Sequence, residues 1–189
     1  MSATATTPPT SRLIRRLDGL EWPAAGAWQL PPGVSLDVHR TQRFRSRAIR
    51  VPIRGGTLVV DERGLHSTLD LHLAPTCPLA AGGLALHAVV TAADRSGTWI
   101  VSGSALVDDI DRPLVGSVRY CGVYRTGWRA TAWLEVSLSV PRGHRGVPRL
   151  DMSGQLDALA PDLCVAPAFG STEVASAGDR SSGCDLTGR

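Results

Sequence analysis

The chain has 189 residues, of which 43% are hydrophobic and 20% are charged, and its formal net charge is +3 at pH 7. These values exclude a wholly disordered chain, and no apolar run approaches the ~20 residues that a membrane-spanning helix needs. The charge is too small to indicate a nucleic-acid-binding protein. All 20 basic residues are arginines, which we attribute to a GC-rich bacterial genome, so arginine carries no special meaning by itself.

Residues 1–27 comprise a polar leader and a short amphipathic segment. Leucines recur there at helical spacing between a serine, which is a common helix cap, and a proline, which ends helices. We therefore expect a short helix of about three turns that packs across the end of the main domain. The leader lacks the charge and the apolar run of a secretory signal, so a cytoplasmic location is expected. The residues that carry the helical pattern are Ser11, Leu13, Leu17, Leu20 and Pro23.

From residue 28 to residue 158, apolar and polar side chains alternate as they do in strands with one buried face. The alternation is clearest at 128–140, where Trp128, Leu134 and Val136 share a face and Trp133 lies on the other. Glycine- and proline-containing turns, including one expected at Gly55-Gly56, separate the runs. Further runs lie at 34–39, 42–53, 56–62, 65–73, 84–92, 97–107, 113–124 and 149–157.

About eight or nine sequential strands of this kind predict an all-β fold, a single antiparallel up-and-down β-barrel of the lipocalin-like type. A barrel of about eight strands is filled by side chains or holds one small ligand. Residues 159–189 are rich in Ser, Gly and Ala without periodicity, and we expect a disordered tail. The predicted organisation is a leader with a helix (1–27), a barrel (28–158) and a flexible tail (159–189).

Three segments along this region are WQLPPGVSLDVH, VPIRGGTLVVDERG and WIVSGSALVDDIDRPLVGSV. They resemble the YceI-like family, in which a Trp and a Ser…His strand precede a glycine-marked hairpin and a later Gly-Leu-acidic-turn-Pro segment. Trp28, Ser35 and His39 occupy the first positions, and Gly103 and Pro113 occupy two of the later ones. The resemblance covers roughly residues 28–158 and implies a lipocalin-like barrel that binds a polyisoprenoid or similar amphiphilic lipid in its interior. The region before the Trp99 strand is shorter than in the family, which leaves the ligand's length open.

The predicted inward faces supply the candidate ligand contacts. Trp99 and Trp128 are expected to point inward, where aromatic side chains commonly line pockets. Small residues on the same faces, such as Gly103 and Ala132, favour a cavity over a filled core, because a packed core calls for larger side chains. The expected interior ligand-binding residues are Leu69, Leu71, Leu86, Val90, Trp99, Val101, Trp128, Ala130, Leu134 and Val136.

Arg43, Arg45 and Arg47 alternate along a predicted strand, so they share one face. Guanidinium groups about 6.6 Å apart can hold phosphates, which suits an anionic headgroup at the mouth of the barrel. Phe44 points away from that face, which disfavours single-stranded nucleic acid, and no nucleic-acid partner is expected. A solvated outer strand face is the simpler explanation of the same run.

Candidates for catalysis and metal binding are few. His39 and His87 are the only candidates for an interior haem ligand, and no cofactor is expected. The acidic residues at 108–111 fit a turn before a proline rather than a Ca²⁺ loop. The four cysteines are widely spaced, with Cys121 expected to be buried in a strand, so no metal site is expected. No local hydrolase or phosphate-binding motif is present.

The leading hypothesis is therefore non-catalytic binding or carriage of an apolar or amphiphilic, isoprenoid-like ligand inside the barrel. One alternative is an interaction module that presents its Arg-rich strand and Trp133 to a protein or an anionic surface. Another is an enzyme that acts on a lipophilic small molecule with dispersed residues such as His39 and His87. The sequence leaves the oligomeric state open.

Overall fold

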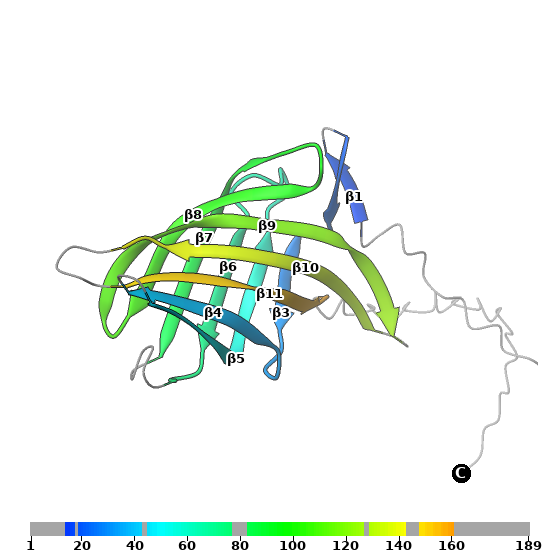
Figure 1. Ribbon diagram of the computed structural model, residues 1–189. Coiled ribbons are helices and arrows are strands. Elements are labelled where there is room, and N and C mark those ends of the chain that lie inside the picture. The colour runs from blue at the N-terminus through cyan, green and yellow to red at the C-terminus, as the bar shows by residue number, and fades with distance from the viewer. Residues whose placement is uncertain are drawn as a thin grey trace, which may run out of the picture.

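The strands of the chain are seen in a computed structural model that describes residues 14–17, 19–42, 45–76, 83–126, 129–142 and 148–160. No helix occurs within these ranges. Figure 1 shows long, curved strands that follow one another in sequence. They are β1 (Ile14–Leu17), β2 (Leu20–Pro23), β3 (Gly26–Leu30), β4 (Ser35–Gln42), β5 (Arg45–Val60), β6 (Thr68–Leu73), β7 (Leu84–Ala93), β8 (Thr98–Val107), β9 (Ile110–Thr126), β10 (Arg129–Val140) and β11 (Arg149–Leu159).

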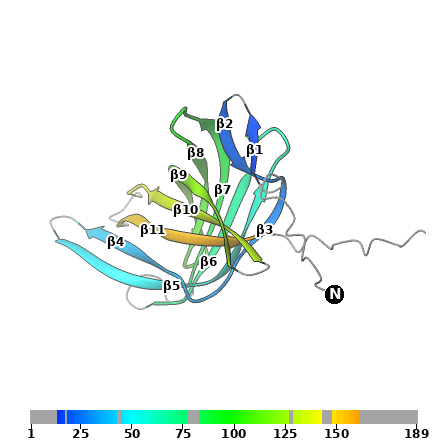
Figure 2. The same ribbon diagram turned by 90° about the vertical axis from the view of Figure 1, so that its right-hand side faces the viewer.

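Strands β3 to β11 form one large antiparallel sheet whose hydrogen bonding returns on itself (Figures 1 and 2). Each strand from β4 to β10 pairs with the next, and β11 pairs with both β10 and β4. The last pairing is short, from Arg149 to Ser153 on β11. The all-β prediction is confirmed for the described residues, and the ring of pairings is compatible with a β-barrel.

The predicted turn at Gly55-Gly56 is wrong, because both glycines lie inside the continuous strand β5. The first part of β5 pairs with β4 and its last part, from Gly56 to Val60, pairs with β3. A register shift against β6 occurs between Ile53 and Gly55, and Gly55 has a φ of +152°. Glycine tolerates such a bulge, which bends the strand. The pair therefore lets one strand curve past two partners instead of reversing the chain.

The predicted N-terminal helix is also wrong, since β1 and β2 form a two-stranded hairpin separate from the large sheet. Gly19 has a φ of +80°, which suits a tight turn. The dipeptide Asp-Gly at 18–19 is a strong hairpin signal that the helical spacing of leucines obscured. The hairpin buries Trp22, which is 2% exposed and lies outside the predicted leucine stripe.

The inner faces of the strands meet in one continuous hydrophobic cluster. Alternation placed most of these residues correctly, but Leu65 lies in the turn before β6 and is exposed rather than sharing the buried face of Leu69. In the described ranges, no helix is long and apolar enough to cross a membrane. The predicted flexible tail lies outside the described residues from position 161 onward.

Candidate functional site

The predicted interior ligand contacts lie together on the inner face of the sheet. A ligand-sized space would leave its lining accessible to a water molecule placed inside it. The described members of the set are at most 6% exposed and, except for Ala130, belong to one hydrophobic cluster. Trp128 lies outside the described residues. The buried members of the set are Leu69, Leu71, Leu86, Val90, Trp99, Val101, Ala130, Leu134 and Val136.

Gly103, one of the small residues taken as signs of a cavity, lies very close to the backbone of a neighbouring strand. A Cβ atom added to Gly103 would lie 1.9 Å from the carbonyl oxygen of His87 on β7. Ala105 and Ala132 are both completely buried. Glycine at 103 therefore admits the backbone of a neighbouring strand at close range, as tightly curved sheets require. A glycine at this position indicates close strand approach and does not require a ligand space.

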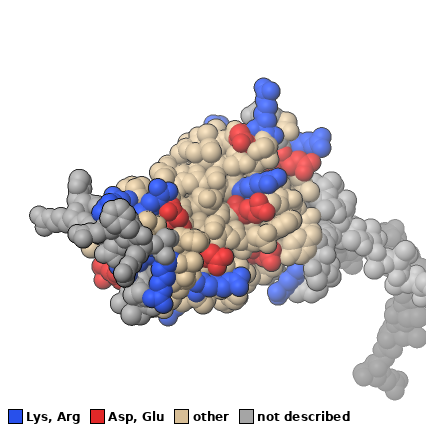
Figure 3. Space-filling view, viewed as in Figure 1, with Lys and Arg blue, Asp and Glu red and all other residues tan. Residues whose placement is uncertain are grey.

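The predicted arginine run lies where β4 and β5 project at one end of the ring. Arg43 and the side chain of Arg45 lie outside what is described, and Arg47 is exposed. The register sets Arg47 directly opposite Arg40, following the inner-face pairs Val38–Ile49 and Leu36–Val51. Because directly opposite residues share a face, Arg40 and Arg47 continue the inner face beyond the apolar core. Figure 3 shows basic side chains gathered around this end, on the left of the view.

A further arginine, Arg112 of β9, lies on the inner face near the same end and is only 7% exposed. Its guanidinium donates hydrogen bonds to the carbonyl oxygens of Pro141 and Pro148, the latter at 3.0 Å. No carboxylate pairs with it among the described residues. Burial lowers the pKa of Arg112. The side chain joins the end of β10 to the start of β11, a role that sequence reasoning missed although Arg112 alternates with buried Leu114.

Two of the acidic residues predicted to form a turn, Asp108 and Asp109, do so between β8 and β9, whereas Asp111 lies in β9. Asp108 and Asp109 have φ values of +49° and +63°, which aspartate tolerates in a tight hairpin turn. Both are exposed, as is Asp111. In the described part of the chain, no group of three or more His, Cys, Asp or Glu side chains is placed to hold a metal ion.

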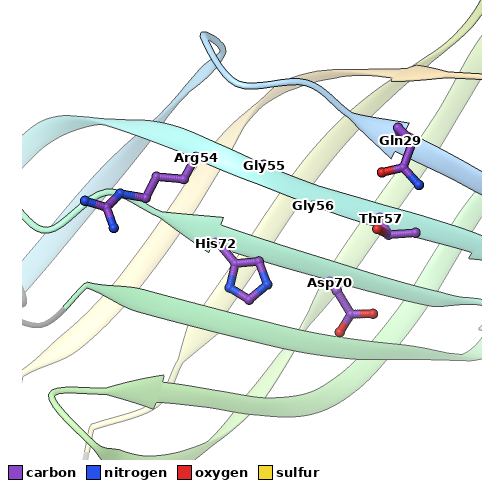
Figure 4. A pocket seen from close by; sticks show the side chains of 7 residues that line it. All are labelled: Gln29, Arg54, Gly55, Gly56, Thr57, Asp70 and His72. Atoms are coloured by element: carbon purple, nitrogen blue, oxygen red, sulfur yellow. The ribbon is translucent and has the colours of Figure 1, made fainter.

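An open depression of about 390 Å³ lies on the outer face of the sheet. Figure 4 shows Asp70 and His72 projecting from β6, with Asp70 near Thr57 of β5, while Arg54 extends away from them. Nδ1 of His87 lies 2.6 Å from Oδ1 of Asp70, which fixes the imidazole beside the depression. The lining residues are Gln29, Arg54, Gly55, Gly56, Thr57, Asp70 and His72.

The two histidines considered for an interior haem ligand are on the outer surface. His39 and His87 are both exposed, because each alternates with buried neighbours on its strand. Neither of them therefore points into the interior of the sheet. Cys121 lies in β9 as predicted but is half-buried rather than buried. Burial and the nearby Glu135 raise the pKa of its thiol.

Aromatic rings gather at the end of the sheet opposite the arginines. Trp99 points inward as predicted and stacks on Tyr120, with centroids 6.1 Å apart and planes 6° apart. Trp22 of the N-terminal hairpin stacks on Trp99, with centroids 4.8 Å apart and planes 12° apart. Burial raises the pKa of Tyr120 to about 12. Trp133 lies on the outer face and is 38% exposed, as its position in the alternation predicted.

No protein-family model matches the chain, and no curated protein matches its sequence. Inferences about its function therefore rest on the geometry described above.

Proposed function

We propose that the chain is a non-catalytic interaction module that recognises an anionic surface through the arginine-bearing end of its sheet, where β4 and β5 project. The observation that carries this proposal is the continuation of the inner face from buried aliphatic residues to Arg40 and Arg47. Guanidinium groups bind carboxylates and phosphates through paired hydrogen bonds. An anionic partner that approaches this end meets such groups first.

The placement of the arginines supports recognition of an anion over a purely solvated strand face. Arg40 and Arg47 lie directly opposite each other on neighbouring strands. Like charges directly opposite each other destabilise a sheet, and a nearby anion relieves that repulsion. Arg112, which is buried close to the same end, adds a further positive charge. The concentration of positive charge at this end would thus attract an anion.

The side chains of the inner face are buried, which favours a binding site at an end of the sheet over one in its interior. The buried hydrophobic residues of the inner face are at most 8% exposed. A ligand that entered between them would have to displace well-packed side chains, which costs about as much as the packing contributed. Recognition at the arginine-bearing end needs no such rearrangement.

Sedimentation with phospholipid vesicles tests the proposal. The protein should bind vesicles that contain phosphatidylglycerol and not vesicles of phosphatidylcholine alone, and added salt should weaken the binding. The double variant Arg45→Glu/Arg47→Glu should lose most of this binding. The matched control is Arg63→Glu/Arg95→Glu, which reverses two exposed arginines in the β5–β6 and β7–β8 turns at the other end. Equal losses in the two variants would contradict a specific arginine-bearing site.

A second candidate function is carriage of an amphiphilic, isoprenoid-like ligand in a lipocalin-like β-barrel. The continuous apolar inner face that ends in arginines favours it, since an apolar tail and an anionic head would find matching surfaces. The resemblance of residues 28–158 to YceI-like proteins points the same way. Such a ligand would have to open the packed core. Carriage therefore predicts a bound form whose interior differs from the packed interior described above.

A further inference from the structure

Among the described residues of the N-terminal hairpin, Trp22 alone stacks on an aromatic residue of the large sheet. Its ring lies on Trp99, which in turn stacks on Tyr120. The hairpin is a separate two-stranded sheet, which Figures 1 and 2 show beside the ring at the end opposite the β4–β5 connection. The surface beneath Trp22 belongs to the ring. It includes Trp99 and also Gly64, where an added Cβ would lie 2.9 Å from the Trp22 ring. This surface is therefore shaped to accept a flat ring.

Two polar groups near this surface lack partners. The indole nitrogen of Trp99 and the hydroxyl of Tyr120 are buried and have no hydrogen-bond partner among the described residues. The side chains themselves are 1% and 7% exposed. Trp28, in the same core, differs in that its indole nitrogen donates to the carbonyl oxygen of Ala24 at 2.9 Å. A buried donor without an acceptor is destabilising and calls for an explanation.

Side chains, and not strand pairing, attach the described residues of the hairpin to the ring. In the described residues, its backbone pairing is internal, between β1 and β2, and none joins it to the ring. Trp22 and Leu17 pack against the core of the ring, and the guanidinium of Arg15 donates to the carbonyl oxygens of Asp61 and Glu62. Displacement of the hairpin would break these contacts and leave the sheet pairings of the ring intact.

We propose that the surface beneath Trp22 is a binding site for a flat aromatic molecule that carries a hydrogen-bond acceptor, and that Trp22 fills this site when the molecule is absent. The ring of the ligand takes the place of the Trp22 indole against Trp99. Its acceptor atom receives a hydrogen bond from the hydroxyl of Tyr120. That hydroxyl lies close enough to Glu21 of the hairpin for burial and that carboxylate together to raise its pKa. The site lies at the opposite end from the arginines, so it goes beyond the function proposed above and does not depend on it.

Coumarin and naphthalene form a matched pair of probes, because both are flat and of similar size but only coumarin has a carbonyl acceptor. Quenching of tryptophan fluorescence measures their binding. Trp22→Ala should bind coumarin at least tenfold more tightly than the unmodified protein and several-fold more tightly than naphthalene. The control is Trp133→Ala, which removes an exposed tryptophan from the outer face and should leave coumarin binding unchanged. Adding Tyr120→Phe to Trp22→Ala should reduce the preference for coumarin.

Arg15→Ala keeps Trp22 and loosens the hairpin, so it provides a second test if Trp22→Ala does not fold. It should also bind coumarin more tightly than the unmodified protein. Equal affinity for coumarin and naphthalene in the opened variants would overturn the proposal, since water would then satisfy the buried polar groups. Failure of both variants to bind coumarin would overturn it as well. Neither outcome bears on vesicle binding, so the two proposals fail separately.

Discussion

The indole of Trp22 lies face to face with that of Trp99, 4.8 Å between ring centroids and 12° between planes, and so joins the N-terminal hairpin to the core of the sheet. Trp22→Ala should lower the free energy of unfolding by about 3–5 kcal/mol, because a buried aromatic ring is lost and a space is left. Urea denaturation measures the change. Saturating coumarin should restore part of the loss, since a ligand of the folded state stabilises it. A loss no larger than that of Trp133→Ala would contradict this role for Trp22.

Gly103 should not tolerate a side chain. Gly103→Ala places a Cβ 1.9 Å from the carbonyl oxygen of His87, and backbone rather than a flexible side chain must then move. We expect a loss of about 1–3 kcal/mol in the free energy of unfolding, as for other overpacked sites. Ser102→Ala, one residue earlier and on the exposed outer face, is the control and should change it by less than about 0.5 kcal/mol. Similar unfolding midpoints for the two variants would rule out the close strand approach.

The hydroxyl of Tyr120 makes stability sensitive to alkaline pH. Burial raises its pKa in the folded protein to about 12, from 10.0 in the unfolded chain. Below pH 10 both states keep the proton, so Tyr120 adds no pH dependence. Between pH 10 and pH 12 the unfolded chain binds fewer protons, and the free energy of unfolding should fall by up to about 1.4 kcal/mol per pH unit.

Denaturation series at pH 9, 10 and 11 measure this slope. Tyr120→Phe should reduce it, while the exposed Tyr124, whose pKa is also raised by burial, contributes equally to both proteins. An identical slope with and without the Tyr120 hydroxyl would show that this group titrates normally.

Arg112 should stabilise the end of the sheet where β10 leaves and β11 begins. Arg112→Ala removes two hydrogen bonds to the carbonyl oxygens of Pro141 and Pro148 together with the buried stem of the side chain. We expect a loss of about 2–3 kcal/mol in the free energy of unfolding. Amide exchange should accelerate at Leu150 and not at Trp99. Arg95→Ala, at an exposed turn, is the control, and equal effects of the two substitutions would refute the assignment.

Period-2 alternation predicted most strands of residues 28–158 and the direction of most of their side chains. It placed Trp99 and Leu134 inward and Trp133 outward. This works because successive side chains of a strand point to opposite faces, so a strand with one buried face has apolar residues at every second position. It could not predict that β5 continues through Gly55-Gly56. The same two glycines form a hairpin turn or a bulge, and the choice depends on the tertiary requirement that β5 pair with both β3 and β4.

The packing of the interior and the N-terminal hairpin lay beyond sequence reasoning. Gly103 and Ala132 were interpreted as the lining of a cavity. The volume of the interior depends on how closely neighbouring strands approach one another, and the sequence of a single strand does not determine that distance. The hairpin carried a local signal, Asp-Gly at 18–19, that competed with a helical spacing of leucines. The burial of Trp22 against Trp99 favours the hairpin over the helix. The pairing of Arg40 with Arg47 follows from register, which alternation leaves undetermined.

Native mass spectrometry of the protein purified without detergent tests most directly whether its interior is a packed core. A packed core, with Trp22 on Trp99, predicts the mass of the bare chain and no lipid in an organic extract of the same sample. A stoichiometric isoprenoid or other amphiphile that dissociates only on unfolding would contradict it and would favour carriage inside a barrel.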